Sequence, residues 1–223
     1  MRRTLAGMTA LAILLVPVAV EAQSAVNRDD VSAIDEVWAG TDAGFGLAVN
    51  EHQVVVAYYD ADGWFTVAAR PRSGGAWSRM ALDSIAGWDS HNSLTVAIDA
   101  AGQIHAAGNM HNQPLTYFRS TAPGDVTTLQ KVSVMVDPDT ERSVTYPVFL
   151  TDADGHLLFK YRDGGSGRGN EIYNRLDPAT GRWQRLLDTP LVDGEAVRSA
   201  YFVGPQLGPD GWFHLVWVWR DTP

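Results

Sequence analysis

Histidine, tyrosine and arginine side chains recur at matching places in this sequence, and together they could move protons beside a bound anion. His91 precedes one apolar run and His111 follows the next, while Tyr146 and Arg162 stand in the same way around the following pair of runs. An arginine can pair with a uronate carboxylate, which acidifies the neighbouring C5 hydrogen and stabilises the enolate-like charge that develops. A nearby cation would also lower the pKa of Tyr146 toward that of a useful base. These four residues are the predicted catalytic residues.

Two other kinds of chemistry are less well supported. Glycoside hydrolysis normally needs two carboxylates about 5–9.5 Å apart, and Asp60, Asp89 and Asp163 form no convincing pair in the sequence. A zinc site usually shows a spacing such as His-Glu-x-x-His or a set of cysteines, and neither is present. We therefore predict no metal site and no cofactor.

An internal repeat explains how the candidate residues could meet. The segments 75–79 (Gly-Ala-Trp-Ser-Arg) and 181–185 (Gly-Arg-Trp-Gln-Arg) are near copies whose tryptophans lie 106 residues apart, or two periods of about 53. Each period contains three or four short runs rich in β-branched and aromatic residues, separated by turn residues. The second run of each period begins at Gln53, Gln103, His156 and Trp212. One full period contains the predicted strands Leu94–Ile98, Gln103–Gly108, Leu115–Ser120 and Val126–Val134.

Four antiparallel strands in about 50 residues are typical of a β-propeller blade. The predicted fold class is therefore all-β, a β-propeller with blades of about 53 residues, and a β-sandwich with chance similarity between segments is the alternative. Residues 23–223 hold about 3.5–4 such periods, so we expect a partial propeller truncated at the C-terminus. Because equivalent loops of successive blades gather on one face, the residues that follow the second strands should share one rim. These residues are Asp60, His111, Arg162 and Arg220.

The N-terminus and the composition bear on location and partners. Arg2 and Arg3 precede a sixteen-residue apolar run, Leu5–Val20, which is shorter than the roughly 20 residues needed to cross a bilayer. We predict a signal peptide over residues 1–22 and a secreted or periplasmic protein, with an uncleaved anchor as the alternative. The net charge of −9 argues against nucleic acid or an anionic membrane as partner. The absence of cysteine excludes disulfides and a lipoprotein anchor.

Two segments carry a resemblance to a known family. Residues 90–120, with His-Asn and Gly-Asn-Met-His-Asn, and residues 146–170, with Tyr-Arg-Asp-Gly-Gly-Ser-Gly, are similar to the BNR-4 (neuraminidase-type) repeat family. That family includes seven-bladed-propeller ulvan lyases, which act on rhamnose–glucuronate glycans. The resemblance implies that this chain is the N-terminal part, about 3.5–4 blades, of a seven-bladed propeller.

The resemblance also implies a role for each candidate. His91 and His111 match the two histidines of the family's site, Tyr146 matches the catalytic tyrosine, and Arg162 matches the arginine that neutralises the uronate carboxylate. Arg220 looks like a further substrate-contacting arginine. The asparagines beside the histidines are also expected to bind substrate, namely Asn92, Asn109 and Asn112.

The predicted function is that of a secreted polysaccharide lyase that cleaves a uronate-containing, ulvan-like glycan by β-elimination and leaves a C4–C5 double bond. One alternative is a rhamnosidase-like glycoside hydrolase on the same scaffold, and another is a non-catalytic carbohydrate-binding propeller. The expected partner is an acidic polysaccharide, with no nucleic acid and no membrane after signal cleavage. The protein is expected to be a monomer.

Overall fold

The computed structural model of the chain describes residues 31–40, 42 and 44–221. The predicted signal peptide, residues 1–22, lies outside these residues, and the architecture below is that of the compact unit that begins at Ile34. Strands and turns make up nearly all of it, with one short 3-10 helix, η2 (Val126–Thr128), so the all-β prediction is confirmed. Within the described part of the chain, no helix is long and apolar enough to span a bilayer.

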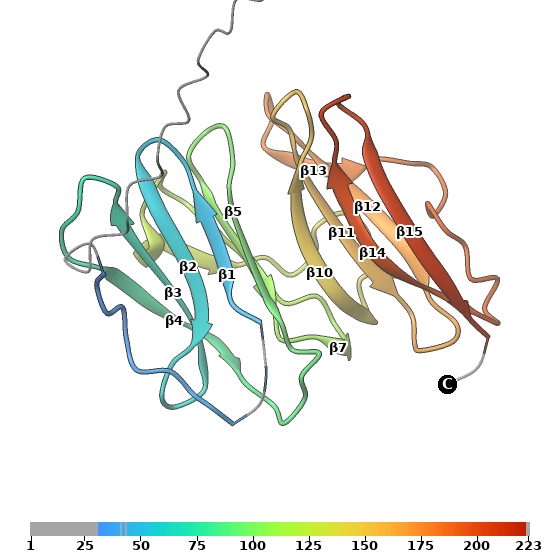
Figure 1. Cartoon of the computed structure of the whole chain (residues 1–223), viewed down its shortest axis with the longest axis horizontal. Coiled ribbons are helices and arrows are strands. Elements are labelled where there is room, and N and C mark those ends of the chain that lie inside the picture. Colours follow the sequence, from blue (N-terminus) through green and yellow to red (C-terminus); the bar gives the residue numbers. More distant parts are fainter. Residues whose placement is uncertain (1–30, 41, 43, 222–223) are drawn as a thin grey trace, which may run out of the picture. The chain divides into compact units, whose positions relative to one another are not determined.

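The first two sheets each contain four antiparallel strands in chain order, and each is called a blade here (Figure 1). Blade one consists of β1 (Gly46–Val49), β2 (Gln53–Tyr59), β3 (Trp64–Pro71) and β4 (Ser78–Ile85). Blade two consists of β5 (Leu94–Ile98), β6 (Ile104–Gly108), β8 (Tyr117–Ser120) and β9 (Leu129–Lys131). The prediction of one strand over Val126–Val134 is wrong, because Asp125 caps η2 by accepting the Thr127 N–H at 2.9 Å and only a three-residue strand follows.

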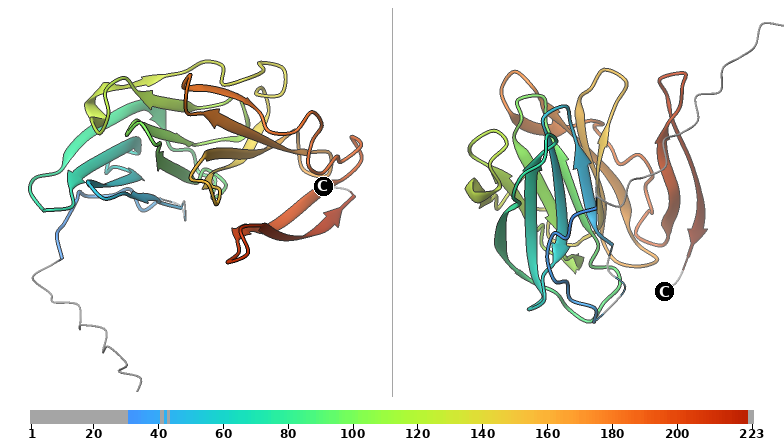
Figure 2. Two further views of the ribbon diagram at one scale, coloured as in Figure 1. Left: turned by 90° about the horizontal axis from the view of Figure 1, so that it is seen from above. Right: turned by 60° about the vertical axis from the view of Figure 1, so that its left-hand side comes forward.

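Blade three has a fifth strand, and the last sheet has two. Blade three consists of β10 (Val144–Thr151), β11 (Leu157–Asp163), β12 (Asn170–Asp177) and β13 (Arg182–Arg185). The segment after β6, expected to be a loop, instead forms β7 (His111–Gln113) and pairs with the free edge of β10. The final pair is β14 (Ser199–Leu207) and β15 (Phe213–Arg220). Figure 2 shows that the four sheets follow one another in chain order, and β5 lies against both β1 and β10.

Aspartate turns recur in the first three sheets: Asp99 and Asp152 stand in the turns before the second strands of blades two and three, and Asp60 in the turn after the second strand of blade one. Asp60, Asp99 and Asp152 each accept the backbone N–H groups two and four residues further on, at 2.8–3.1 Å. The predicted starts of the second strands agree with the structure to within one residue in all four sheets. The side chain of each aspartate thus organises a tight turn, as aspartate does when it bonds its own backbone.

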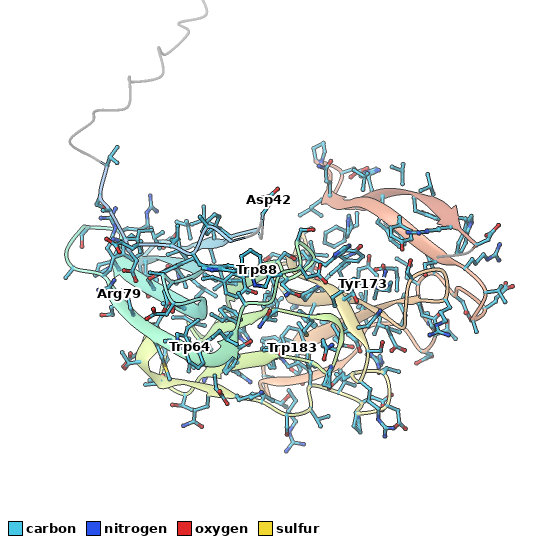
Figure 3. All side chains as sticks on the ribbon, turned by 90° about the horizontal axis from the view of Figure 1, so that it is seen from below. Asp42, Trp64, Arg79, Trp88, Tyr173 and Trp183 are labelled. Atoms are coloured by element: carbon cyan, nitrogen blue, oxygen red, sulfur yellow. The ribbon has the colours of Figure 1, made fainter. Side chains whose placement is uncertain are left out.

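An aromatic cluster fills the space between blades two and three. The ring of Trp183, labelled in Figure 3, lies 6.2 Å from the rings of both Phe149 and Phe159. Its Nε1 donates to the Tyr117 hydroxyl at 3.0 Å. That hydroxyl also lies 2.7 Å from the Nδ1 atom of His105. His105 is fully buried, and burial lowers its pKa despite an adjacent aspartate, so it belongs to the core rather than to a site.

Truncation of this cluster should destabilise the protein strongly. Phe159 is fully buried, so we expect Phe159→Ala to lower the free energy of unfolding by about 3–5 kcal/mol through lost burial and a cavity. The control is Leu47→Ala, because Leu47 is 66% exposed on β1 and its truncation should cost less than about 0.5 kcal/mol. Urea titration measures both, and equal losses in the two variants would contradict the packing.

Candidate active site

Two histidines and an aspartate form the centre of the site. His91 lies in the turn before β5, and His111 is the first residue of β7. The Nδ1 atom of His91 is 2.6 Å from Oδ1 of Asp89, and the Nδ1 atom of His111 is 2.5 Å from Oδ2 of the same carboxylate. The imidazole rings stack with their centroids 4.1 Å apart and their planes 18° apart. One carboxylate therefore holds both rings, and the sequence did not predict its role.

The shared carboxylate determines which ring nitrogens carry protons. An ionised carboxylate only accepts hydrogen bonds, so each Nδ1 must donate, and the lone pair of a neutral ring is then on Nε2. The backbone N–H of His91 and both imidazoles hold the pKa of Asp89 well below its usual range, against the opposing effect of burial. Asp89 is consequently ionised at neutral pH, and each neutral histidine presents a basic Nε2.

A bulge in β10 brings the Tyr146 side chain close to the histidine pair. The register of β10 against β11 shifts between Thr145 and Val148, and Tyr146, which precedes Pro147, has a φ angle of 56°. Such a backbone is strained for a bulky residue, and strain of this kind is concentrated at functional sites. The Tyr146 ring lies 5.7 Å from that of His91.

The prediction that a nearby cation brings the pKa of Tyr146 below its usual value is wrong, although the charge of Arg162 acts in the expected direction. Burial of the phenol raises its pKa, and this outweighs the lowering by the charge of Arg162. Asp89 and Tyr201 raise the pKa further. Tyr146 is therefore protonated at neutral pH, which suits a proton donor better than a base.

Arg162 is more deeply placed than a residue at the rim would be. It lies within β11 rather than after it, and only 2% of its surface is exposed. Its Nε donates to the Gly164 carbonyl at 3.0 Å, and its Nη2 donates to Thr145 Oγ1 at 3.0 Å and to Asn112 Oδ1 at 3.3 Å. The guanidinium carbon is 5.0 Å from the centroid of the Tyr146 ring. These contacts fix the charge directly beside the tyrosine.

Among the described residues no carboxylate forms an ion pair with Arg162, although the charge of Arg162 lowers the pKa of Glu171. Glu171, opposite Arg162 on β12, pairs instead with Lys160 at 3.2 Å. A Cβ atom added to Gly169 would lie 2.7 Å from two carbons of the arginine stem, so this glycine is what allows the close packing. Buried charges are normally paired. An anionic ligand would supply the pairing that the protein itself does not.

The three asparagines predicted to bind substrate have different surroundings. Asn112 touches the guanidinium as described, and its side chain is part of the site. The Asn109 amide donates to Ser84 Oγ and to the Ile85 carbonyl, both at 2.7 Å, so it joins blades one and two. Asn92 is buried, and its carbonyl accepts the Tyr59 hydroxyl at 2.7 Å. The last two asparagines therefore shape the walls of the site.

Tyr201, absent from the sequence-based list, joins the cluster from β14. Its hydroxyl is 2.8 Å from the Ser166 hydroxyl, and the Arg220 guanidinium carbon is 5.7 Å from the centroid of its ring. Burial alone would raise its pKa. The hydrogen bond with Ser166 and the charges of Arg162 and Arg220 outweigh burial, so that the pKa of Tyr201 is lowered. The cluster thus contains one tyrosine of raised pKa and one of lowered pKa.

The repeat could have revealed Tyr201. It follows Tyr146 by 55 residues, close to the period of about 53, and Arg220 follows Arg162 by 58. In both blades the tyrosine is on the first strand and the arginine is on the second, with the guanidinium against the ring. The histidines stand differently, since His91 lies in the turn before β5 and His111 lies on β7, which pairs with β10 of blade three. The cluster therefore combines a histidine pair where blades two and three meet with one tyrosine–arginine pair from blade three and one from the β14–β15 sheet.

Asp60, predicted to share the rim, has a different role. Its carboxylate accepts the Trp64 N–H and the Thr66 hydroxyl, both at 2.9 Å, within the turn between β2 and β3. Like Arg162, Asp60 lies near the end of the second strand of its blade. Its carboxylate, however, stabilises the turn and forms no hydrogen bond or ion pair with the histidine, tyrosine or arginine side chains described above.

Asp89, His91 and His111 are also the residues best placed to hold a metal ion. Their nitrogen–oxygen distances of 2.5–2.6 Å are those of hydrogen bonds. Ligand atoms about 2.0–2.1 Å from a tetrahedral zinc ion would lie about 3.3 Å apart. The geometry therefore fits shared protons better than a metal. In a second acidic group, at residues 152–156, Asp152 is engaged in its turn.

The sheets and the cluster define an antiparallel bladed protein with a polar site at one end of its strands. A family model described as a BNR repeat-containing family member matches residues 53–223. The chain accordingly belongs to this family, BNR_4.

Individual relatives share parts of the chain. The "Ulvan lyase, long isoform" of Glaciecola sp. (strain KUL10) is 33% identical over 67 residues, which is 30% of this chain and 7% of that protein. The solved structure of the polysaccharide lyase Uly1 matches 70% of this chain with a TM-score of 0.59 at 19% identity. A PL25 ulvan lyase bound to -[GlcA(1-4)Rha3S]- matches 73% of it with a TM-score of 0.54 at 15% identity. The chain spans 44% and 41% of these two proteins.

The two tyrosines predict an unusual titration. Among the seven tyrosines of the chain, Tyr201 has a lowered pKa and the other six have raised values. Spectrophotometric titration should therefore show one tyrosinate forming below about pH 10. Tyr201→Phe should abolish this first step, and Arg220→Ala should move it to higher pH. The control Tyr173→Phe should leave it intact; if it does not, the assignment to Tyr201 is wrong.

Asp89 predicts a pH-dependent contribution to stability. Its pKa is depressed in the folded state, so its contribution is complete above the unfolded value of about 3.9 and is lost as the pH falls toward the folded value. Because the side chain is 35% exposed, we expect Asp89→Asn to cost only about 1 kcal/mol at pH 7, or roughly 2–4 °C in Tm. The difference in stability between the wild-type protein and Asp89→Asn should shrink progressively below about pH 4. The exposed Asp62→Asn serves as control, and a pH-independent gap for Asp89→Asn would contradict the linkage.

Proposed function

We propose that this protein is a polysaccharide lyase that cleaves a uronate-containing glycan by β-elimination. The observation that carries the proposal is the buried guanidinium of Arg162, which forms no ion pair with a described carboxylate, beside Tyr146 and the histidine pair. The family and the fold support it, since two solved structures that share the fold, with TM-scores of 0.59 and 0.54, are polysaccharide lyases. One of them is bound to a glycan of alternating glucuronate and sulfated rhamnose.

The proposed reaction needs a base, an acid and a cation. The Nε2 atom of His91 takes the C5 proton of the uronate, because Asp89 keeps the other nitrogen protonated. Arg162 stabilises the negative charge that develops on the carboxylate, and Arg220, beside Tyr201, adds a second positive charge. Tyr146 gives its phenolic proton to the O4 atom as the C4–O4 bond breaks. The C5–H electron pair becomes the C4–C5 double bond, and a proton then passes from His91 back to Tyr146, directly or through water.

Hydrolysis is less compatible with this cluster. A glycosidase needs two carboxylates on either side of the bond, and among the described residues Asp89 is the one carboxylate that is hydrogen-bonded to His91, His111 or Tyr146. Both of its oxygens are already hydrogen-bonded to imidazoles. A protein that binds the glycan without cleaving it would keep the arginines but would not need the aligned Nε2 atoms.

Export and architecture complete the proposal. We infer that residues 1–22 direct secretion and that the sheets are successive blades of a β-propeller. The contacts of β5 with β1 and β10 support this arrangement, because the first strands of neighbouring blades adjoin around a propeller axis. In such an arrangement the site lies where the three residue pairs converge.

The test is elimination itself. The full chain is mixed with ulvan, and the ultraviolet absorbance of the unsaturated uronate is followed. His91→Ala and Tyr146→Phe should each lower the rate about 10²–10⁴-fold, the usual contribution of a general base or acid. Tyr173→Phe, which changes a tyrosine outside the cluster, should retain full activity.

Three outcomes separate the alternatives. Wild-type activity in both site variants would show that the mechanism is wrong. New reducing ends without absorbance would indicate a hydrolase. Binding of the glycan without either signal would indicate a carbohydrate-binding protein.

A further inference from the structure

A polar groove leaves the histidine pair on the side of blades one and two. It encloses about 650 Å³, within the range of about 300–1,000 Å³ that is usual for ligand sites. Asp89 and His111 line it, whereas His91, Tyr146 and Arg162 do not. The proton-transfer centre therefore has the arginines on one side and this groove on the other.

The lining of the groove suits a hydrated sugar chain. No tryptophan, tyrosine or phenylalanine lines it, and its polar groups are amides and hydroxyls such as those of Gln113, Thr116 and Ser133. The Asn109 amide connects the end of β6 to β4 and so makes the groove wall continuous across two blades. Such a surface can hydrogen-bond to hydroxyl groups along an extended ligand.

Lys131, at the end of β9, gives the groove a positive charge. It is one of only two lysines in the chain, and the other, Lys160, is buried against Glu171. Lys131 is exposed. Its ammonium has no hydrogen-bond or ion-pair partner among residues 31–40, 42 and 44–221. Two acids line the same groove, Asp83 and Asp89, and the second is already bound by the histidines.

We propose that this groove is a subsite for the neighbouring sugars of an anionic polysaccharide, with Lys131 paired to an anionic substituent of one of them. The inference rests on the proposed function, because cleavage within a chain requires sugars to be held on both sides of the bond. The substituent is a carboxylate or a sulfate ester, which share the same charge and acceptor chemistry. Lys131 acts in binding and takes no part in the bond changes.

A larger groove of about 960 Å³ does not compete for this role. It lies at the opposite ends of the strands, where Asn50, His52, Gly102 and Asp125 line it. None of the residues of the proton-transfer centre borders it, so a glycan bound there would not reach the histidines.

The experiment compares Lys131→Ala with two matched variants in the full chain. Lys131→Arg keeps the charge, and Arg182→Ala removes a cation from exposed β13, outside the groove. Binding of ulvan is measured by calorimetry, and steady-state elimination is measured separately. We expect Lys131→Ala alone to raise Kd and KM for the polymer about twofold to fivefold at low salt, as for an exposed ion pair, with kcat unchanged. The effect should shrink as ionic strength rises.

Desulfated ulvan identifies the substituent. If the Lys131→Ala effect vanishes on the desulfated polymer, the partner is a sulfate ester, and if it persists, the partner is a carboxylate. Wild-type affinity in Lys131→Ala, or an equal loss in Arg182→Ala, would overturn the subsite. Failure of the wild-type protein to bind either polymer would overturn it as well.

The two proposals can fail separately. If Lys131→Ala weakens binding while the wild-type protein shows no elimination, the subsite stands and the proposed lyase activity falls. If elimination occurs with an unchanged KM in Lys131→Ala, the activity stands and the subsite falls. A second variant, Ser133→Trp, fills the groove and should weaken polymer binding while sparing the shortest oligosaccharide that is cleaved.

Discussion

The stacking of successive antiparallel sheets is the constraint on which the rest of this structure depends. A sheet of about 50 residues cannot bury both of its faces alone, so each blade must pack against the next. The aromatic cluster of Phe149, Phe159 and Trp183 fills the space between blades two and three. Because the sheets stack with their strands in the same order, equivalent positions of different blades come close together at one end.

The site is a consequence of this repetition. The two histidines lie where blades two and three meet, and blade three and the β14–β15 sheet each contribute a tyrosine with a guanidinium against its ring. The sheets share antiparallel strands in chain order, but they carry different side chains at the site. One carboxylate, that of Asp89, converts the two stacked imidazoles into a pair with both Nε2 atoms available. The bulge at Tyr146 then brings a protonated phenol beside them.

Electrostatics gives the two tyrosines opposite characters. Tyr146 and Tyr201 lie on the first strands of successive sheets and both interact with the charge of Arg162, yet the pKa of the first is raised and that of the second is lowered. Burial of the phenol raises the pKa of Tyr146, whereas the hydrogen bond with Ser166 and the charge of Arg220 lower that of Tyr201.

The sequence by itself determined the strands, the turns and the identity of the polar residues. Period-two apolar runs and Asp-x-x-Gly turns are local signals, so the second strands could be placed to within one residue. The repeat also indicated that His91, His111, Tyr146 and Arg162 belong to neighbouring sheets, and it would have indicated Tyr201 had it been extended by one period.

Only the tertiary structure decided how these residues are surrounded. The burial of Arg162, the raised pKa of Tyr146, the shared carboxylate of Asp89 and the engagement of Asn109 by β4 all arise between segments far apart in the chain. Burial and hydrogen bonding depend on neighbours that folding brings together, and these set the protonation state of each group. The residue types were therefore readable from the sequence, whereas their chemical states were not.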